Sequence, residues 1–422
     1  MNQKKAICPY CGEVTSPDEM QKLTVFDDKN IALCKSCLEV ALLDFKKNYF
    51  LEDEDYTADV DTISTNELLS DVITPKELTD KLNEYVKGQE HATKSIAVAF
   101  YKHLVKNKFP QMFRDSNEIN NVLIIGPTGC GKTYTAKLAA KFSGLPFTTV
   151  TASDLTAAGY KGKSVEDILV EIYNSFDGDI SRIQNAVVFI DEIDKIKSNP
   201  GSSGPDVGGE SVQEQLLTII GGTSVTIELS ARQTATIDTH NMLFIAAGAF
   251  SGITDFLPDD KKANPSVSIG FNTTANNNKV ADVNELYLSV GTDEIIKYGF
   301  KPEFIGRFSK VVSLKTLTKD DLINILTTAK GNQLHAKINF FKAIGVNLEI
   351  NEDVFETIAQ KALDNKTGAR GIANSLDRAL ENTIFEVGSD SLVSKCVLTK
   401  EMAENNDAEP VLFFEDEKEA SK

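Results

Sequence analysis

Residues 122–133 read Val-Leu-Ile-Ile-Gly-Pro-Thr-Gly-Cys-Gly-Lys-Thr, an apolar run that leads into a glycine-rich loop ending in Lys-Thr. The pattern predicts a buried strand, a phosphate-binding loop and then a helix over residues 134–142. Glycines let the backbone N–H groups of such a loop face an anion. Lys132 is expected to reach the β- and γ-phosphates of a nucleoside triphosphate, and the Thr133 hydroxyl to bind Mg²⁺. The nucleotide-binding residues expected here are Gly126, Pro127, Thr128, Gly129, Cys130, Gly131, Lys132 and Thr133.

A second apolar segment ends in two carboxylates. Residues 186–190 read Ala-Val-Val-Phe-Ile and are followed directly by Asp191 and Glu192. Acidic residues after a strand are common, so the pair alone would indicate little. Opposite a phosphate-binding loop, however, Asp191 is expected to orient Mg²⁺, and Glu192 to act as general base toward the attacking water. Together the two segments predict an ATPase.

Strands and helices alternate through the central part of the chain. Further strands are expected at residues 146–150 and 242–246, and helices over residues 165–176 and 211–220. This alternation predicts an α/β fold of the P-loop NTPase type, with a parallel sheet and helices on both of its faces.

Composition excludes several classes of function. The chain has 422 residues, of which 41% are hydrophobic, and that is enough for about three domains with cores of their own. The formal net charge of -18 argues against direct nucleic-acid binding, because phosphate contacts need clustered Lys and Arg. The sequence shows no signal segment and no apolar run near the roughly 18 residues that a membrane span needs. A soluble, cytoplasmic protein with no membrane partner is therefore expected.

The N-terminal segment carries four of the six cysteines in two Cys-x-x-Cys pairs, with a predicted hairpin between them at residues 23–33. Such pairs supply four thiolates to one tetrahedral Zn²⁺, and a module this small needs the metal to fold. Cys-Pro-Tyr-Cys is also a redox dithiol pattern, but that alternative requires a surrounding βαβ unit that the sequence lacks. Zinc is therefore the favoured ligand. The expected zinc ligands are Cys8, Cys11, Cys34 and Cys37.

The C-terminal part has its own alternation of elements. A helix is expected from Thr318, a strand at residues 346–350, and a last long helix opened by Thr-Gly-Ala-Arg-Gly at residues 367–371. Arg370 at that helix start opposes the helix dipole, so it is expected to serve a phosphate. Acidic runs near residue 55 and after Glu401 indicate a linker and a tail. The expected domains are a zinc module at 1–50, a linker at 51–73, a large domain at 74–312, a small domain at 313–400 and a tail at 401–422.

In content and order, these motifs resemble the ClpX family of AAA+ protein unfoldases. The resemblance covers nearly the whole chain. It implies a homohexameric ring that threads polypeptides through a central pore at the expense of ATP, with a small α/β sensor-2 domain and a treble-clef or zinc-ribbon-like N-terminal module open to adaptors. The matching segments are the cysteine pairs, Gly88-Gln89, the phosphate loop, residues 159–162, 191–195, 248–250, 269–271, 302–307 and 368–371.

The resemblance also implies roles for single residues around the nucleotide. Arg307 would reach the γ-phosphate held by a neighbouring subunit, and Arg370 would contact the phosphates of its own subunit. Val86 would lie against adenine. Both arginines would stabilise charge that develops during phosphoryl transfer.

Two further segments gain a role from the resemblance. Tyr160, within Gly-Tyr-Lys-Gly, would grip the substrate in the pore, whereas by itself this motif could be a surface turn. Ile269, Gly270 and Phe271 would dock on a ClpP-type peptidase, although an apolar tripeptide in a polar loop is more often a local anchor.

The chain departs from the family pattern at several positions. Lys161 replaces an aliphatic pore residue, and residues 229–235 replace an Arg-Lys-His loop. Ala246 and Ala247 provide no polar sensor-1 side chain. Two other functions stay open: a remodeller of protein complexes that works without a peptidase, and a non-catalytic ATP-binding zinc adaptor.

Overall fold

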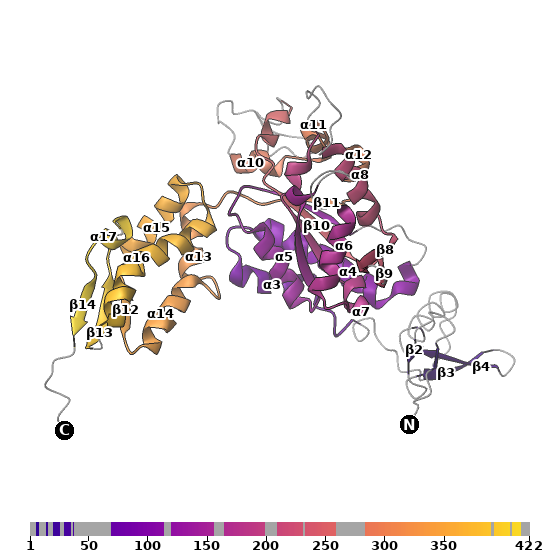
Figure 1. Cartoon of the computed structure of the whole chain (residues 1–422), viewed down its shortest axis with the longest axis horizontal. Helices are drawn as coiled ribbons and strands as arrows, with labels where there is room; N and C mark the ends of the chain where they lie inside the picture. The colour runs from indigo at the N-terminus through magenta and orange to yellow at the C-terminus, as the bar shows by residue number, and fades with distance from the viewer. Residues whose placement is uncertain are drawn as a thin grey trace, which may run out of the picture.

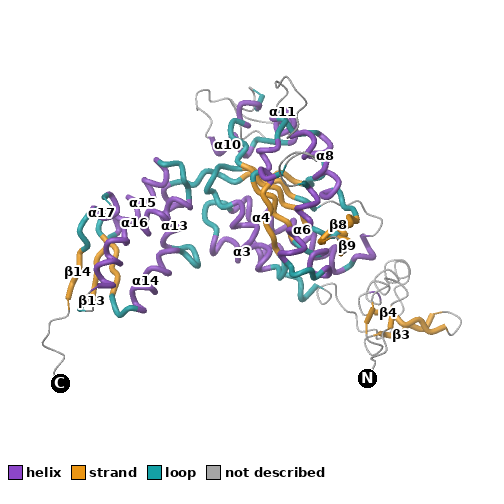
Figure 2. The backbone as a smooth tube through the Cα atoms, in the orientation of Figure 1, coloured by secondary structure: helices purple, strands orange, loops and turns teal. Residues whose placement is uncertain are grey.

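The computed structural model describes two domains that meet at a nucleotide-sized pocket, together with short N-terminal strands (Figures 1 and 2). Tyr160, Ile269, Gly270, Phe271, Cys8 and Cys11 lie outside the described residues. In the part of the chain that is described, no helix is long and apolar enough to cross a membrane. The described residues are 6–7, 14–15, 20–25, 29–34, 37, 69–113, 120–155, 164–198, 209–230, 233–258, 283–389, 392–405 and 407–414.

The large domain is built on a five-stranded sheet in the order β11-β5-β10-β7-β6. All neighbouring pairs are parallel, as the alternation of strands and helices predicts. The strands are β5 (Val122–Ile125), β6 (Phe147–Thr151), β7 (Val187–Asp191), β10 (Leu243–Gly248) and β11 (Lys310–Ser313). An antiparallel hairpin, β8 (Ser224–Ser230) and β9 (Gln233–Asp238), forms a separate sheet.

Helices cover both faces of this sheet. The helices of the large domain are α3 (Pro75–Tyr85), α4 (Glu90–Lys108), α5 (Lys132–Phe142), α6 (Val165–Ser175), α7 (Ile180–Gln184), α8 (Gly209–Ile220), α10 (Val283–Leu288), α11 (Thr292–Tyr298) and α12 (Pro302–Ile305). Short 3-10 turns are η2 (Pro110–Phe113), η3 (Ala152–Asp154), η4 (Ile193–Ile196) and η5 (Ile253–Phe256).

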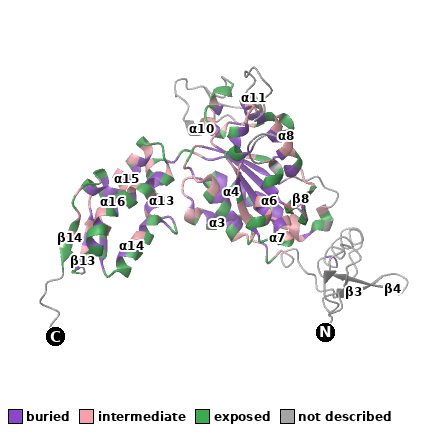
Figure 3. Cartoon of the chain, in the orientation of Figure 1, coloured by how far each residue is buried: buried purple, intermediate pink, exposed green. Residues whose placement is uncertain are grey.

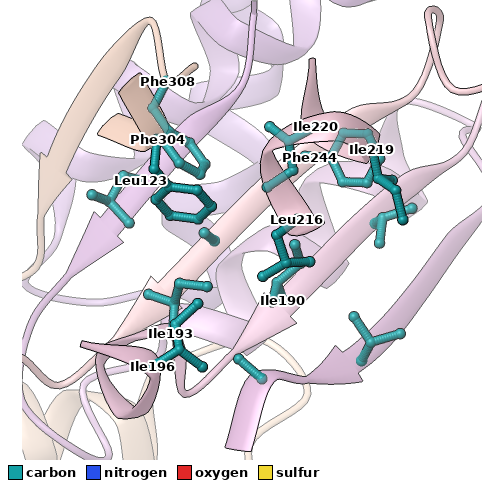
Figure 4. Close-up of a cluster of buried hydrophobic side chains, with 14 of the residues drawn as sticks. Leu123, Ile190, Ile193, Ile196, Leu216, Ile219, Ile220, Phe244, Phe304 and Phe308 are labelled. Atoms are coloured by element: carbon teal, nitrogen blue, oxygen red, sulfur yellow. The ribbon is translucent and has the colours of Figure 1, made fainter. Parts of the chain in front are cut away.

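The central strands are apolar throughout because both of their faces are buried. Ile124 and Phe189 face one core, which contains residues of α3, α4 and α5. Their chain neighbours Leu123 and Ile190 face the other core, which contains residues of α6 and α8. Figure 4 shows this second core, and Figure 3 shows the buried sheet at the centre of the domain.

The small domain has its own core and a three-stranded sheet in the order β12-β13-β14. It extends beyond the boundary expected at residue 400, because β14 pairs with β13 as far as Phe414. Its elements are α13 (Lys319–Thr327), α14 (Gln333–Ala343), β12 (Asn347–Ile350), α15 (Glu352–Asp364), α16 (Ala369–Ser389), β13 (Val393–Leu398), α17 (Lys400–Glu404) and β14 (Val411–Phe414).

Four short strands are described near the N-terminus: β1 (Ala6–Ile7), β2 (Val14–Thr15), β3 (Met20–Val25) and β4 (Lys29–Cys34). β3 and β4 form an antiparallel hairpin, which confirms the hairpin expected between the cysteine pairs. Cys34 is the last residue of β4, and Cys37 is buried.

Candidate nucleotide site

A pocket of about 540 Å³ lies at the carboxyl ends of β5, β7 and β10, between the large and small domains. This is the edge of a parallel sheet where ligands bind in open α/β folds. Both domains line the pocket. The lining includes Tyr85, Val86, Lys87, Thr128, Gly129, Cys130, Gly131, Lys132, Thr133, Tyr134, Asp191, Glu192, Asp194, Ala249, Leu317, Leu326, Ala329, Lys330, Arg370 and Ile372.

The phosphate loop follows β5 and runs directly into α5. Gly126, Gly129 and Gly131 have φ values of 153°, 75° and 100°, which L side chains rarely adopt. α5 begins at Lys132, so its first N–H groups are free to bind an anion. The Lys132 ammonium donates to the carbonyl oxygens of Gly126 at 2.7 Å and Pro127 at 2.9 Å. The loop carbonyls therefore hold the Lys132 ammonium in place, and a phosphate bound in the loop could contact the same ammonium.

Two oxygen donors meet beside the loop. The Thr133 hydroxyl donates to Asp191 Oδ2 at 3.1 Å, although 58 positions separate the two residues. A hydroxyl next to a carboxylate is the oxygen-rich donor set that Mg²⁺ prefers. The residues present therefore fit the ion that the sequence predicts.

Glu192 is held in an uncommon conformation. Its φ of 55° lies in the left-handed region, which is sparsely populated by residues other than glycine and occurs at functional sites. The Ser153 hydroxyl donates to Glu192 Oε2 at 2.8 Å. Parallel pairing of β6 with β7 places Thr151 beside Asp191, so Ser153 and Glu192 leave the sheet at the same edge. Sequence reasoning missed Ser153 because no local motif marks it.

Asp194 lies beside the end of β10, where the sequence provides no polar sensor-1 side chain. It is buried, and its Oδ1 accepts a hydrogen bond from the Ala249 N–H at 3.0 Å, just beyond β10. A Cβ on Gly248 would lie 2.5 Å from that same oxygen. The carboxylate thus fixes the end of β10 against the turn that carries Glu192.

Cys130 is the one thiol in the phosphate loop. It is buried, and burial raises its pKa, although the nearby Lys132 ammonium acts in the opposite direction. The thiol is therefore protonated at neutral pH, and the loop binds through its backbone rather than through a thiolate.

Part of the pocket lining is apolar and aromatic. Val86, which the resemblance places against adenine, lines it together with Tyr85 and Tyr134 from the large domain. The small domain contributes its apolar side chains from α13 and α16. A flat heteroaromatic base fits such a surface. The apolar side chains on this side are Leu317 of the segment before α13, Leu326 of α13, Ala329 just after α13 and Ile372 of α16.

The two predicted arginines lie in different places. Arg370 is in the first turn of α16 and lines the pocket with the phosphate loop. Arg307 does not line this pocket. It precedes β11, whose first residue Lys310 pairs with Val122 at the start of β5, whereas the phosphate loop follows the end of β5. Arg307 therefore lies toward the opposite edge of the sheet from its own phosphate loop.

Comparison with known proteins agrees with this geometry. The family described as AAA domain (Cdc48 subfamily) matches residues 117–311, and the C-terminal, D2-small domain of ClpB protein matches residues 317–396. A protein of Treponema denticola is 35% identical over 98% of this chain and 98% of its own length, and one of Borrelia duttonii is 34% identical over 98% and 94%. Both are named ATP-dependent Clp protease ATP-binding subunit ClpX. The chain therefore belongs to the ClpX family of AAA-domain, ATP-dependent unfoldases.

Proposed function

We propose that this chain forms a homohexameric ring that hydrolyses ATP in order to unfold proteins and pass them to a ClpP-type peptidase. The observation that carries the proposal is the pocket itself. It gathers the phosphate loop, both carboxylates and Arg370, yet leaves Arg307 at the other edge of the sheet. The arginine missing from this pocket can be supplied by Arg307 of a second copy of the chain in a symmetric ring.

Each residue of the pocket has a distinct role in this reaction. The backbone of residues 126–131 and the Lys132 ammonium bind the phosphates, while Thr133 and Asp191 would hold Mg²⁺. The metal would neutralise charge on the β- and γ-phosphates. Glu192 orients the attacking water and accepts its proton, and Ser153 positions the Glu192 carboxylate. Arg370 and a neighbour's Arg307 stabilise the charge that develops on the transferred phosphoryl group.

The substrate and peptidase contacts fall on residues that lie outside the described part of the chain. We propose that Tyr160 grips the polypeptide, because an aromatic ring between glycines packs on many different side chains. We also propose that Ile269, Gly270 and Phe271 dock on the peptidase. Lys161 next to Tyr160 would favour acidic substrate segments.

Unfolding of a fluorescent protein that carries an unstructured tail tests the function. We expect its fluorescence to fall with ATP and to stay constant with ADP, and a Lys132→Ala chain to be inactive because it cannot hold the phosphates. With a ClpP-type peptidase added, the protein should be degraded, and Phe271→Ala should abolish degradation but not unfolding. Degradation unaffected by Phe271→Ala would reject the docking role. Unfolding without any degradation would favour a remodeller that acts alone, and ATP binding without hydrolysis would favour the adaptor.

We propose that the N-terminal cysteines bind one Zn²⁺. Substituting Cys37 by Ser should remove the metal, because the ion loses one of four thiolate ligands. Zinc content of the purified protein, measured by mass spectrometry, checks this. Cys396→Ser is the matched control, since Cys396 is equally buried but lies in the small domain. A Cys37→Ser protein that keeps its zinc would contradict the assignment.

A further inference from the structure

The segment that joins the two domains is hydrogen-bonded to a buried side-chain amide of the large domain. This segment, residues 314–318, connects β11 to α13. Gln89, which caps the start of α4, is only 3% exposed. Its Nε2 donates to the Lys315 carbonyl at 2.8 Å, and its Oε1 accepts from the Lys315 N–H at 2.9 Å. A single side-chain amide therefore pairs with the backbone of the joining segment in both directions.

The same amide also reaches the phosphate loop. Gln89 Nε2 lies 3.5 Å from the carbonyl oxygen of Cys130, at the limit of a hydrogen bond. The donor group is thus shared between a carbonyl of the phosphate loop and a carbonyl of the joining segment. A shift of Cys130 toward Nε2 would strengthen the hydrogen bond to the Cys130 carbonyl at the expense of the bond to the Lys315 carbonyl. A shift away from Nε2 would have the opposite effect.

The residues just before Gln89 are fixed to the small domain as well. The Lys330 N–H donates to the Glu84 carbonyl at 2.9 Å, and the Lys330 ammonium lies 3.0 Å from the Glu84 carboxylate. That ion pair is exposed and weak by itself, so the backbone bond is the firmer contact. Gly88 has a φ of 73°, and a Cβ there would lie 2.6 Å from Asp321 of α13.

Three residues of the pocket lining lie between these anchors. Tyr85, Val86 and Lys87 line the pocket, and the segment that carries them is held by the small domain at Glu84 and by the joining segment at Gln89. On the other side of the loop, the Ala369 N–H donates to the Gly129 carbonyl at 3.0 Å. The phosphate loop therefore touches the small domain directly at Gly129. It meets the joining segment at Gly126, where a Cβ would lie 2.7 Å from the Leu314 carbonyl oxygen, and also through Gln89.

We propose that Gln89 is a positioning residue that couples the phosphate loop to the angle between the large and small domains. The inference rests on the proposed ATPase function and adds a route by which nucleotide changes the shape of the subunit. Phosphates that draw the backbone of the loop inward shift Cys130, the shared amide follows, and the joining segment moves with it through Lys315. Gln89 does not line the pocket, so its effect is expected on geometry rather than on affinity.

A second buried glutamine provides a matched control. Gln213 of α8 donates to the carbonyls of Ile196 at 2.8 Å and Gly299 at 3.2 Å, and it accepts from the Lys301 N–H at 2.9 Å. It is fully buried and makes the same pattern of three bonds as Gln89. All of its partners, however, belong to the large domain. Replacing Gln213 therefore measures the effect of losing a buried, hydrogen-bonded glutamine amide that does not link the two domains.

The test compares Gln89→Met with Gln213→Met, because Met has a similar length and no amide. Spin labels introduced as non-natural amino acids at the exposed positions Lys141 and Glu381 report the distance between the domains. In the wild-type chain and in Gln213→Met, ATPγS is expected to shift this distance. In Gln89→Met the shift should be clearly smaller than in Gln213→Met, because the direct contacts of the phosphate loop at Gly126 and Gly129 remain. The kcat for ATP should fall about tenfold, the equivalent of about one net hydrogen bond, with KM nearly unchanged.

Two results would overturn the coupling role. One is a distance shift of wild-type size in Gln89→Met, and the other is an equal loss of shift and kcat in both variants, which would indicate destabilisation. Gln89→Asn, which keeps the amide but is one methylene shorter, carries the same expectations if Gln89→Met does not fold. A wild-type chain that hydrolyses no ATP would instead refute the proposed function, and the inference with it. Wild-type hydrolysis with no effect at Gln89 refutes the inference alone.

Discussion

A Glu192→Gln chain is expected to bind ATP but to hydrolyse it on the order of 10²- to 10⁴-fold more slowly than the wild type, the usual contribution of a general base. The amide keeps the size of the side chain but cannot accept a proton from water. The Ser153 hydroxyl still has an oxygen acceptor at 2.8 Å, so the local geometry should persist. Phosphate release under saturating ATP measures the loss.

Binding and hydrolysis must be separated for this result to identify a base. A fluorescent ATP analogue should bind the Glu192→Gln chain with nearly wild-type affinity, because the phosphate loop and Lys132 are unchanged. Asp194→Asn is a useful comparison, since Asp194 is a second carboxylate of the pocket lining, and its Oδ1 is bonded to the Ala249 N–H. The Asp194→Asn substitution should lower the rate of ATP hydrolysis less than Glu192→Gln does. Normal turnover in the Glu192→Gln chain would remove Glu192 from the mechanism.

The parts of the site predicted from sequence are those that local motifs specify. The phosphate loop, Asp191 and Glu192 each follow an apolar strand that the structure places in the central sheet. Ser153 was missed because its partner lies 39 positions away, and only the pairing of β6 with β7 brings the two together. Contacts created by strand register leave no pattern in a single segment of sequence.

The fold of the small domain shows the same limit. Acidic composition predicts a tail after residue 400, but the apolar residues of β14 pair with β13, and that pairing is not local. Helix α14 was also not expected. Its Phe340 is exposed while the adjacent Phe341 is buried, so the apolar residues do not mark one face clearly. In the sequence Gln89 stands out only as part of a family motif, because its hydrogen bonds to Lys315 join residues 226 positions apart.

Arg307→Ala is expected to lower kcat on the order of 10³-fold or more, the range for a cation that stabilises the phosphoryl-transfer transition state. The structure gives this arginine no role in its own pocket, because it precedes β11 at the sheet edge opposite to the phosphate loop. Its guanidinium lies against the C-terminal end of α8, where a Cβ on Gly221 would be 3.2 Å from it. Arg307 therefore acts, in this proposal, only on the nucleotide of a neighbouring subunit.

That assignment makes a complementation experiment decisive. An Arg307→Ala subunit keeps Glu192, and a Glu192→Gln subunit keeps Arg307, so a mixed ring contains interfaces at which both groups are intact. Random mixing in equal amounts places the two variants in the productive order at about one interface in four of a head-to-tail ring. The mixture should then hydrolyse ATP far faster than either variant alone. If both residues acted within one chain, no interface could be restored, and the mixed ring would be as inactive as its parents.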